Sequence, residues 1–192
     1  MFTNNFDPVA FNLFAFEIRW YSIAYIFGIL FGWFYCKRFL IRDKIISKLF
    51  DDLVTYLIIG IIVGGRLGYI LFYNLEYYFQ NFIEIFFIWE GGMSFHGGLI
   101  GIMVATYLYS KKHKINKYIF LDLISVSAPI GLFFGRIANF INGELVGKAT
   151  NGSWGVIYPQ IDDVPRHPSQ LYECFLEGII LFIILNLIYF KK

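Results

Sequence analysis

Three side chains that carry, or can carry, a positive charge lie inside apolar stretches of this 192-residue chain: Arg66, His96 and Arg136. A charged guanidinium at the centre of a lipid bilayer costs about 3 kcal/mol on insertion scales and more in simulations. A protein that keeps such a group there either pairs it or uses it. Near a lipid headgroup an arginine can bind phosphate through two parallel hydrogen bonds, and a histidine can take up a proton near neutral pH. The three residues therefore predict acid–base chemistry and anion stabilisation on an anionic lipid.

Polar residues accompany Arg136 along the chain. Asn139 follows three residues later, on the same face of a helix, where its amide can orient an oxygen. Asn142 and Glu144 come directly after the apolar stretch, and Tyr21 stands near the start of the first apolar stretch of the chain. These positions extend the candidate site beyond the three cations.

Each of these residues also has a purely structural interpretation. A lone intramembrane histidine is more often a hydrogen-bonded packing residue than a catalyst, and Tyr21 fits an interface anchor. Arg136 can hold two helices together through Glu173 or Glu177. Taken singly, Tyr21, Glu173 and Arg66 favour the structural interpretation. Taken together, polar groups on several spans at one depth favour a site.

Other chemistries are not indicated by the sequence. It contains no nucleophile elbow, no cysteine–histidine spacing typical of a metal site and no glycine-rich nucleotide loop. Cys36 and Cys174 fall in or beside different apolar stretches and favour packing roles. We therefore expect no covalent catalysis, no cofactor and no metal. The net charge of +2 is too small to indicate a nucleic-acid partner.

The apolar stretches define the fold that must position these groups. Hydrophobic residues make up 58% of the chain and charged residues 16%, against about 25% charged residues in soluble domains. Five stretches approach the length that crosses a bilayer as a helix: residues 20–36, 53–72, 93–109, 118–141 and 172–190. The sequence predicts an all-α, polytopic membrane bundle that forms a single transmembrane domain over residues 1–192, with a short external segment at 143–168.

The lysines and arginines predict the orientation. They gather after the first predicted span, after the third, and at the C-terminus: Lys37, Arg38, Arg42, Lys44, Lys48, Lys111, Lys112, Lys114, Lys117, Lys191 and Lys192. In a five-span arrangement all of these lie on one side, which predicts an external N-terminus and a cytoplasmic C-terminus. Polar residues from all five spans then reach the level of the outer-leaflet headgroups. The aromatic segments 2–16 and 82–89 are expected in the outer interface.

Small residues predict how the spans pack. Glycines four residues apart recur on four of the five predicted spans: Gly28 and Gly32, then Gly60, Gly64 and Gly68, then Gly97 and Gly101, then Gly131 and Gly135. This spacing lets helix backbones approach closely in lipid, where no hydrophobic effect drives association. We therefore expect a tight bundle.

Five sequence blocks resemble the bacterial prolipoprotein diacylglyceryl transferase family. They are Arg19–Ser22, Gly64–Asn74, Trp89–Gly101, Gly135–Gly147 and Arg166–Glu173. They occur in order and cover almost the whole chain. The blocks Met-Ser-Phe-His-Gly-Gly and Gly-Arg-x-x-Asn-Phe-Ile-Asn-Gly-Glu are long and highly specific.

The resemblance implies a multi-pass enzyme of the bacterial inner membrane whose site faces the outer leaflet and periplasm. It implies transfer of the diacylglyceryl group of phosphatidylglycerol to the lipobox cysteine thiol of a prolipoprotein, the first step of lipoprotein maturation. A thioether forms and glycerol phosphate leaves. His96 matches the histidine discussed as the base, and Arg136 matches the arginine that holds the lipid phosphate. Other motif positions tied to function match Tyr21, Asn139, Glu144 and Gly147.

The chemistry of this reaction agrees with the residues. A free thiol, with a pKa of about 8.5, is only a few per cent thiolate at neutral pH, so a base is useful. The departing phosphate gains charge, which arginines can stabilise. We expect His96, Arg136 and Tyr21 to be catalytic groups. We expect the substrates, phosphatidylglycerol and a lipobox peptide, to meet a binding site made of Arg66, Arg136, Asn139, Asn142, Glu144 and Gly147.

The chain departs from the family at its C-terminus. Members continue through two further spans, one of which carries another functional arginine, and their external head is longer than segment 143–168. We expect a truncated product, in which the fold is kept while activity is lost or weak. An inactive homologue that only binds lipid is therefore one alternative to the transferase. A reduced enzyme in which Arg66 replaces the missing arginine is the alternative. A non-enzymatic membrane scaffold or transporter fragment is the alternative of another class, although the repeats and broken helices of transporters are not visible.

Overall fold

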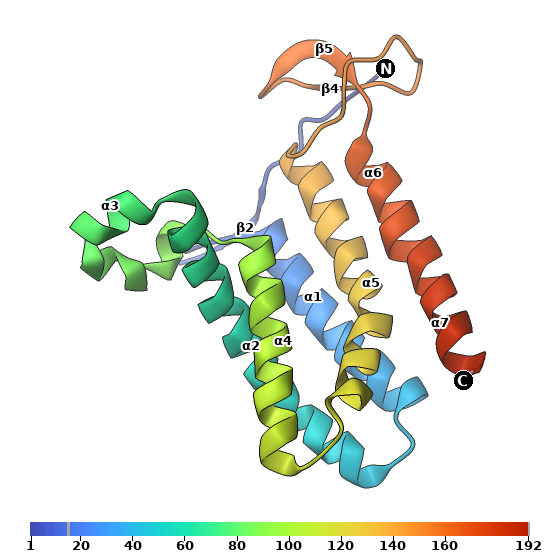
Figure 1. Cartoon of the computed structure of the whole chain (residues 1–192). Coiled ribbons are helices and arrows are strands. Elements are labelled where there is room, and N and C mark those ends of the chain that lie inside the picture. Colours follow the sequence, from blue (N-terminus) through green and yellow to red (C-terminus); the bar gives the residue numbers. More distant parts are fainter. Residues whose placement is uncertain (15, 192) are drawn as a thin grey trace. The chain divides into compact units, whose positions relative to one another are not determined.

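The computed structural model of the chain describes residues 1–14 and 16–191. It is mainly helical (Figure 1) and divides into two compact units. The first unit comprises residues 1–40 and 123–192, and the second comprises residues 41–122. The prediction of a single transmembrane domain over the whole chain stays a prediction.

Three long helical segments lie wholly or for the most part in the first unit. Helix α1 spans Trp20–Tyr35 and continues as a π-helical turn, η1, at Cys36–Leu40. Helix α5 spans Lys117–Asn142. The third segment consists of α6 (Ser169–Glu173), the π-helical stretch η4 (Cys174–Ile180) and α7 (Leu181–Lys191), which follow one another without a break.

Small residues bring these three segments together. A Cβ added at Gly28 of α1 would lie only 2.9 Å from the Cα of Gly131 in α5, and one at Gly178 would lie 2.9 Å from the Cβ of Phe133. Beside the first contact, the rings of Phe31 and Phe134 stack with centroids 5.5 Å apart. Figure 1 shows α1, α5 and α7 side by side. The close approach of α1 and α5 at these glycines agrees with the predicted tight packing of the spans.

Two small sheets flank the helices of the first unit. In one, β4 (Val156–Tyr158) lies between β1 (Phe2–Thr3), to which it is parallel, and β5 (Asp162–Arg166), to which it is antiparallel. In the other, β2 (Val9–Leu13) pairs antiparallel with β3 (Phe16–Arg19). The side-chain amide of the buried Asn4 donates to the carbonyl of Phe140 at 2.5 Å and so ties the N-terminal segment to the end of α5.

The second unit is built around a pair of helices, α2 (Lys44–Tyr73) and α4 (Phe95–His113). Between them the chain forms α3 (Leu75–Gln80) and two 3-10 turns, η2 (Phe82–Phe86) and η3 (Ile88–Glu90). A Cβ added at Gly60 would lie 2.7 Å from the carbonyl oxygen of Gly101, and one at Gly68 would lie 2.7 Å from the Cα of Gly97. The glycine stripes of α2 and α4 thus face each other across this pair, which agrees with the predicted close packing of the spans.

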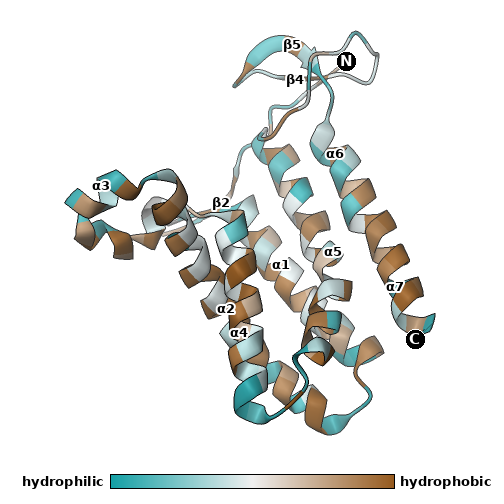
Figure 2. Cartoon of the chain, viewed as in Figure 1, coloured by the Kyte–Doolittle hydropathy of each residue, from teal (hydrophilic) through white to brown (hydrophobic). Residues whose placement is uncertain are grey.

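Within the described residues, four helical segments are long and apolar enough to cross a membrane: Trp20–Leu40, Lys44–Tyr73, Lys117–Asn142 and Ser169–Lys191. They contain four of the five predicted spans, which confirms a membrane helical bundle. The remaining predicted span, 93–109, falls on α4. Glycines near the start of α4 and lysines in its last turn dilute its apolar residues. In Figure 2 the ribbon of α7 is mostly coloured as hydrophobic, whereas one end of α4 is coloured as hydrophilic.

Sequence analysis did not foresee the two sheets. The strands are short, from two to five residues, and alternation over so few positions is a weak signal. β1 and β4 also lie more than 150 residues apart in the chain, so no local pattern reports their pairing.

Candidate functional site

Arg136 lies on α5 opposite two carboxylates of the third helical segment of its unit. Its Nη1 lies 2.9 Å from Oε2 of Glu173, and its Nη2 and Nε donate to Oε2 of Glu177 at 3.1 and 3.3 Å. The two glutamates are four residues apart and therefore share a helix face. The structural pairing that the sequence allowed for Arg136 is thus present, with both candidate glutamates at once.

This arginine is neither fully buried nor fully occupied. Its side chain is 23% exposed, and the side chains of Glu173 and Glu177 are exposed to 37% and 42%. A guanidinium carries five N–H groups in a planar fork, and these contacts use three of them. Its partners are flexible side chains that can rotate away, so another anion, such as a phosphate, can take their place.

Glu177 belongs to the π-helical stretch η4, and Glu173 is the last residue before it. Single π-helical turns inside α-helices are rare and occur frequently at functional sites. The wider turn of a π-helix changes the direction of the side chains along the segment, and Glu177 lies within this turn.

A second cluster forms where α5 ends. Gly143, at φ +64°, turns the chain out of the helix, and the amide of Glu144 donates to the carbonyl of Asn139 at 2.9 Å. The side-chain amides of Asn139 and Asn142 then donate to the two carboxylate oxygens of Glu144, each at 3.3 Å. Asn139 is buried and Glu144 is exposed, so a buried amide orients an exposed carboxylate.

One polar atom of the Asn142 side chain makes no hydrogen bond among the described residues. This atom, the oxygen Oδ1, is buried. Buried polar atoms are paired in the great majority of cases. An acceptor left in this state beside Glu144 suits a hydroxyl group of a bound molecule.

Gln170 holds this turn in place from the third helical segment. It is fully buried, its Nε2 donates to the carbonyl of Glu144 at 2.5 Å, and its Oε1 accepts from the hydroxyl of Tyr158 at 3.2 Å. Burial of Tyr158 raises the pKa of its phenol above the ordinary value, while the hydrogen bond to Gln170 acts in the opposite direction. The sequence analysis did not single out Gln170, although it lies in the Arg166–Glu173 block.

Gly147 lies where the chain after Glu144 meets β5. Its amide donates to the carbonyl of His167 at 3.0 Å, and its carbonyl accepts from Nη1 of Arg166 at 3.3 Å. An added Cβ would lie 2.6 Å from the His167 carbonyl oxygen. Since no side chain fits there, Gly147 allows the close approach that fixes the course of this segment.

Arg166 also bonds to Asp162 through Nε at 3.2 Å and through Nη2. These hydrogen bonds hold the pKa of the Asp162 carboxyl below its usual value and raise the pKa of Arg166.

Tyr21 is the second residue of α1. It is half-buried, and its ring centroid lies 5.2 Å from that of Tyr25. The aromatic pair lies at the end of the helix where the chain leaves β3.

His96 lies in the second unit, as the second residue of α4. Ser94 caps this helix, since its Oγ accepts from the amide of Gly97 at 3.2 Å. The imidazole is exposed and packs edge-on against the ring of Phe95, with centroids 5.6 Å apart. It has no hydrogen-bond partner within residues 1–14 and 16–191. An accessible imidazole of this kind can accept a proton from a bound thiol.

Arg66, also in the second unit, is bound differently. Only 4% of it is exposed, and its guanidinium donates to the backbone carbonyls of Glu84, Ile85 and Gly91 at 2.6, 3.0 and 2.5 Å. The guanidinium also lies over the ring of Tyr78, 5.1 Å from its centroid. This buried arginine therefore uses its hydrogen bonds to hold the chain segment between α2 and α4.

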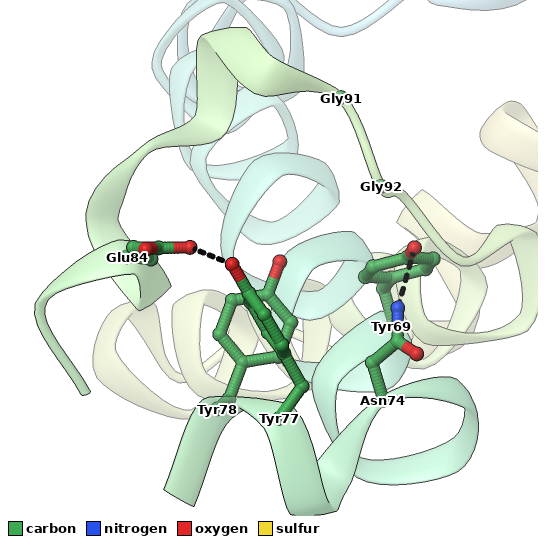
Figure 3. Close-up of a pocket in the computed structure, with 7 residues that line it drawn as sticks. All are labelled: Tyr69, Asn74, Tyr77, Tyr78, Glu84, Gly91 and Gly92. Atoms are coloured by element: carbon green, nitrogen blue, oxygen red, sulfur yellow. Dashed lines mark hydrogen bonds between the residues drawn. The ribbon is translucent and has the colours of Figure 1, made fainter. Parts of the chain in front are cut away.

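An open pocket of about 280 Å³ lies against this segment (Figure 3). It is lined by Tyr69, Asn74, Tyr77, Tyr78, Glu84, Gly91 and Gly92. Its polar groups bond to one another, Tyr77 to Glu84 at 2.6 Å and Asn74 to Tyr69 at 2.8 Å.

The structure brings together Arg136 with two glutamates, and Asn139 with Asn142 and Glu144, all in the first unit. His96 and Arg66 belong to the second unit, and the predicted convergence of the two sets stays a prediction. No group of three or more His, Cys, Asp or Glu side chains suited to hold a metal ion occurs in the described part of the chain.

Comparison with known proteins gives one consistent family. Residues 8–192 match the family model described as prolipoprotein diacylglyceryl transferase. A protein of Rickettsia bellii (strain OSU 85-389), named phosphatidylglycerol–prolipoprotein diacylglyceryl transferase, is 55% identical over 98% of this chain and 72% of its own length. A protein of the same name from Rickettsia canadensis (strain McKiel) is 52% identical over 97% of this chain and 73% of its own length.

Proposed function

The chain belongs to the prolipoprotein diacylglyceryl transferase family, and from this premise we propose that it transfers the diacylglyceryl group of phosphatidylglycerol to the lipobox cysteine of a prolipoprotein. The observation that carries the proposal is the state of Arg136. It is a partly exposed guanidinium in a predicted span, and exchangeable carboxylates hold it.

In the reaction, the thiol sulfur of the lipobox cysteine attacks the glyceryl carbon that bears the phosphate ester. A carbon–sulfur bond forms, the carbon–oxygen bond to phosphate breaks, and the electron pair leaves with the oxygen of glycerol phosphate. The thiol proton goes to a base. Two features of the transition state need help from the protein: the thiol must lose its proton, and the leaving phosphate must carry more charge.

Arg136 meets the second need. As phosphatidylglycerol binds, its phosphate takes the guanidinium from Glu173 and Glu177, and the planar fork binds two phosphate oxygens. The guanidinium then stabilises the charge that develops on the leaving group. Since this charge is largest in the transition state, the contact accelerates the chemical step as well as binding the lipid.

The cluster at the end of α5 suits the glycerol headgroup. The carboxylate of Glu144, oriented by Asn139 and Asn142, accepts a hydrogen bond from a headgroup hydroxyl, and the spare Oδ1 of Asn142 accepts another. Gly147 fixes the chain that follows. The hydroxyl of Tyr21, near the start of its span, is the third catalytic group of the proposal.

His96 meets the first need. Its exposed imidazole takes the proton of the thiol as the sulfur attacks. A positioned general base contributes roughly 10²- to 10⁴-fold to such a step.

We further propose that α4 also crosses the membrane. Together with the four apolar helical segments it gives a bundle of five spans. Its 19 residues reach about 28 Å at 1.5 Å per residue, close to the thickness of the hydrocarbon core. Basic residues then lie on the cytoplasmic side of the inner membrane, the N-terminus lies outside, and the segment 143–168 is periplasmic. The exposed aromatic residues of α3 to η3, among them Phe79, Phe82, Phe86 and Trp89, lie in the outer interface.

The test is transfer in vitro. The chain is reconstituted into vesicles that contain labelled phosphatidylglycerol, and a lipobox peptide with one cysteine is added. We expect the peptide to gain the mass of one diacylglyceryl group while an equal amount of glycerol phosphate is released. A peptide with serine in place of cysteine is the matched control. Binding of the lipid without any transfer would contradict the enzymatic proposal and leave a lipid-binding protein.

The role of His96 has its own test. We expect His96→Gln to slow transfer about 100-fold or more while binding of phosphatidylglycerol to the protein persists. His113→Gln, at the other end of the same helix, is the control and should leave both unchanged. Loss of lipid binding in His96→Gln would make this residue a headgroup ligand instead of the base.

A further inference from the structure

Arg66 makes its hydrogen bonds to the chain segment that leads into α4. The Nε group donates to Ile85, Nη2 to Glu84, and Nη1 to Gly91 at 2.5 Å with a longer contact of 3.4 Å to Gly92. These carbonyls come from both ends of the segment, before η3 and after it. One side chain of α2 therefore fixes a stretch of nine residues at two places.

The segment needs such fixation because of its two glycines. Gly91 and Gly92 have φ values of +87° and +78°, in the region that glycine enters without steric cost and other residues rarely adopt. Two consecutive glycines are also the most flexible link that a chain can contain. The backbone alone therefore does not determine where the chain re-enters the helix pair. Figure 3 shows this link above the pocket, with Gly91 and Gly92 labelled.

The start of α4 is attached to the same place. The amide of Ser94 donates to the carbonyl of Gly65, the residue before Arg66, at 2.9 Å, and the hydroxyl of Ser94 caps α4. His96 follows two residues later. The contacts made at Gly65 and Arg66 thus determine the position of the helix end that carries the imidazole.

We propose that Arg66 is a positioning residue that fixes the Glu84–Gly92 segment and through it His96, and that it does not bind the substrate phosphate. The effect of Arg66 on catalysis rests on the function proposed above. Its fixation of the segment does not depend on that function. Burial supports the assignment: a phosphate would have to displace four backbone contacts to reach a side chain that is 4% exposed.

The variant Arg66→Lys tests this assignment. A lysine keeps the charge, but its three donors radiate from one nitrogen and cannot reach carbonyls that the planar guanidinium binds along separate directions. Arg38→Lys, outside the site on η1, is the matched control. Both are compared with the wild type in the vesicles used for transfer, by hydrogen exchange, by steady-state kinetics and by the imidazole resonances of His96.

In Arg66→Lys we expect amide exchange in residues 84–97 to become at least tenfold faster, with exchange in α1 unchanged. We expect kcat to fall at least tenfold while the KM for phosphatidylglycerol stays within about twofold. The His96 resonances, assigned with His96→Gln, should shift or broaden while those of His167 do not. Arg38→Lys should show none of these changes.

Two results would overturn the proposal. Unchanged exchange in residues 84–97 would show that Arg66 does not fix the segment. A raised KM with kcat and the His96 signal preserved would make Arg66 a phosphate ligand. If the wild type transfers no diacylglyceryl group, the proposed function fails, and the exchange and resonance measurements still decide the positioning role.

A second variant covers the case in which Arg66→Lys does not fold. Gly91→Ala strains the backbone of the same link, because Gly91 has a positive φ that alanine rarely adopts. An added Cβ would meet no atom within 4 Å, so the strain comes from the backbone conformation alone. It should speed up exchange in residues 84–97 and move the His96 signal in the same way. A Gly91→Ala protein with wild-type exchange and His96 signal would also overturn the proposal.

Discussion

The two intramembrane arginines have the same side chain and opposite surroundings. Arg136, on α5, is bound by the side-chain carboxylates of Glu173 and Glu177 and is 23% exposed. Arg66, on α2, is bound by backbone carbonyls of the Glu84–Gly92 segment and is 4% exposed. Sequence alone gives both residues the same description, a guanidinium in an apolar stretch.

The difference lies in what each arginine can give up. A glutamate can rotate its side chain away at a small cost, so its place on Arg136 can pass to a phosphate. A backbone carbonyl cannot leave Arg66 unless the segment itself moves, and the buried guanidinium would then lose a hydrogen-bond partner. Side-chain partners therefore make an exchangeable anion site, and backbone partners make a fixed structural support.

Removal of the exchangeable arginine should have the largest effect. We expect Arg136→Ala to lower the kcat/KM of transfer about 100- to 1,000-fold, the usual loss when a group that stabilises transition-state charge is deleted. The vesicle assay measures it, and Arg38→Ala is the control. An Arg136→Ala enzyme with activity within a few fold of the wild type would remove this residue from the mechanism and with it the contrast between the two arginines.

The first unit also contains a buried side chain that binds a backbone carbonyl, Gln170, and it should behave like Arg66. We expect Gln170→Leu to lower the free energy of unfolding by about 2 kcal/mol, because the carbonyl of Glu144 and the buried hydroxyl of Tyr158 lose their partner. Denaturant unfolding in detergent measures the change. Ser169→Ala, which removes a solvent-exposed hydrogen bond between the half-buried Ser169 and Leu145, should cost clearly less; an equal loss would contradict the role of burial.

The proposed replacement of Glu177 by the lipid phosphate at Arg136 predicts a smaller effect, and one that improves substrate binding instead of impairing it. In the proposed mechanism, Glu177 and the lipid phosphate compete for the same guanidinium, and a partly exposed ion pair contributes up to about 1 kcal/mol. We therefore expect Glu177→Gln to lower the KM for phosphatidylglycerol about fivefold.

Glu84→Gln is the matched control for this competition. Its backbone carbonyl, and not its carboxylate, binds Arg66, so the KM should not change. A higher KM in Glu177→Gln would mean that the glutamate orients Arg136 for the lipid instead of competing with it.

The smallest effect concerns a side-chain pair outside the membrane-spanning helices. The hydrogen bonds from Arg166 hold the pKa of the Asp162 carboxyl below its usual value. The pair therefore stabilises the folded chain above the carboxyl's unfolded pKa of about 3.9, and this contribution is lost as the pH falls through the lower folded pKa.

Thermal unfolding between pH 7 and pH 3 tests this expectation in the wild type and in Asp162→Asn. The difference in Tm between the two proteins should be present at pH 7 and shrink at the acid end. A constant difference would mean that the charge of Asp162 contributes nothing.

Much of the fold was predictable because each membrane-spanning helix is a long apolar stretch that is visible in the sequence. Spans 20–36, 53–72, 118–141 and 172–190 each fall on an apolar helix, and the facing glycines of α2 and α4 pack as their spacing predicts. The pairing of Arg136 with a glutamate, which the sequence offered as its structural interpretation, is also present. The sheets and the role of Gln170 were not predictable, since they depend on pairings between distant segments.

The sequence by itself determined that the chain is a helical membrane protein, where most of its spans lie, and which charged residues they contain. Hydropathy and residue type are local properties, and each can be read from a window of the chain. Only the tertiary structure decided which partners each arginine has. Glu177 lies 41 residues from Arg136, and the carbonyls that bind Arg66 belong to the backbone, which is the same at every residue and leaves no trace in the sequence.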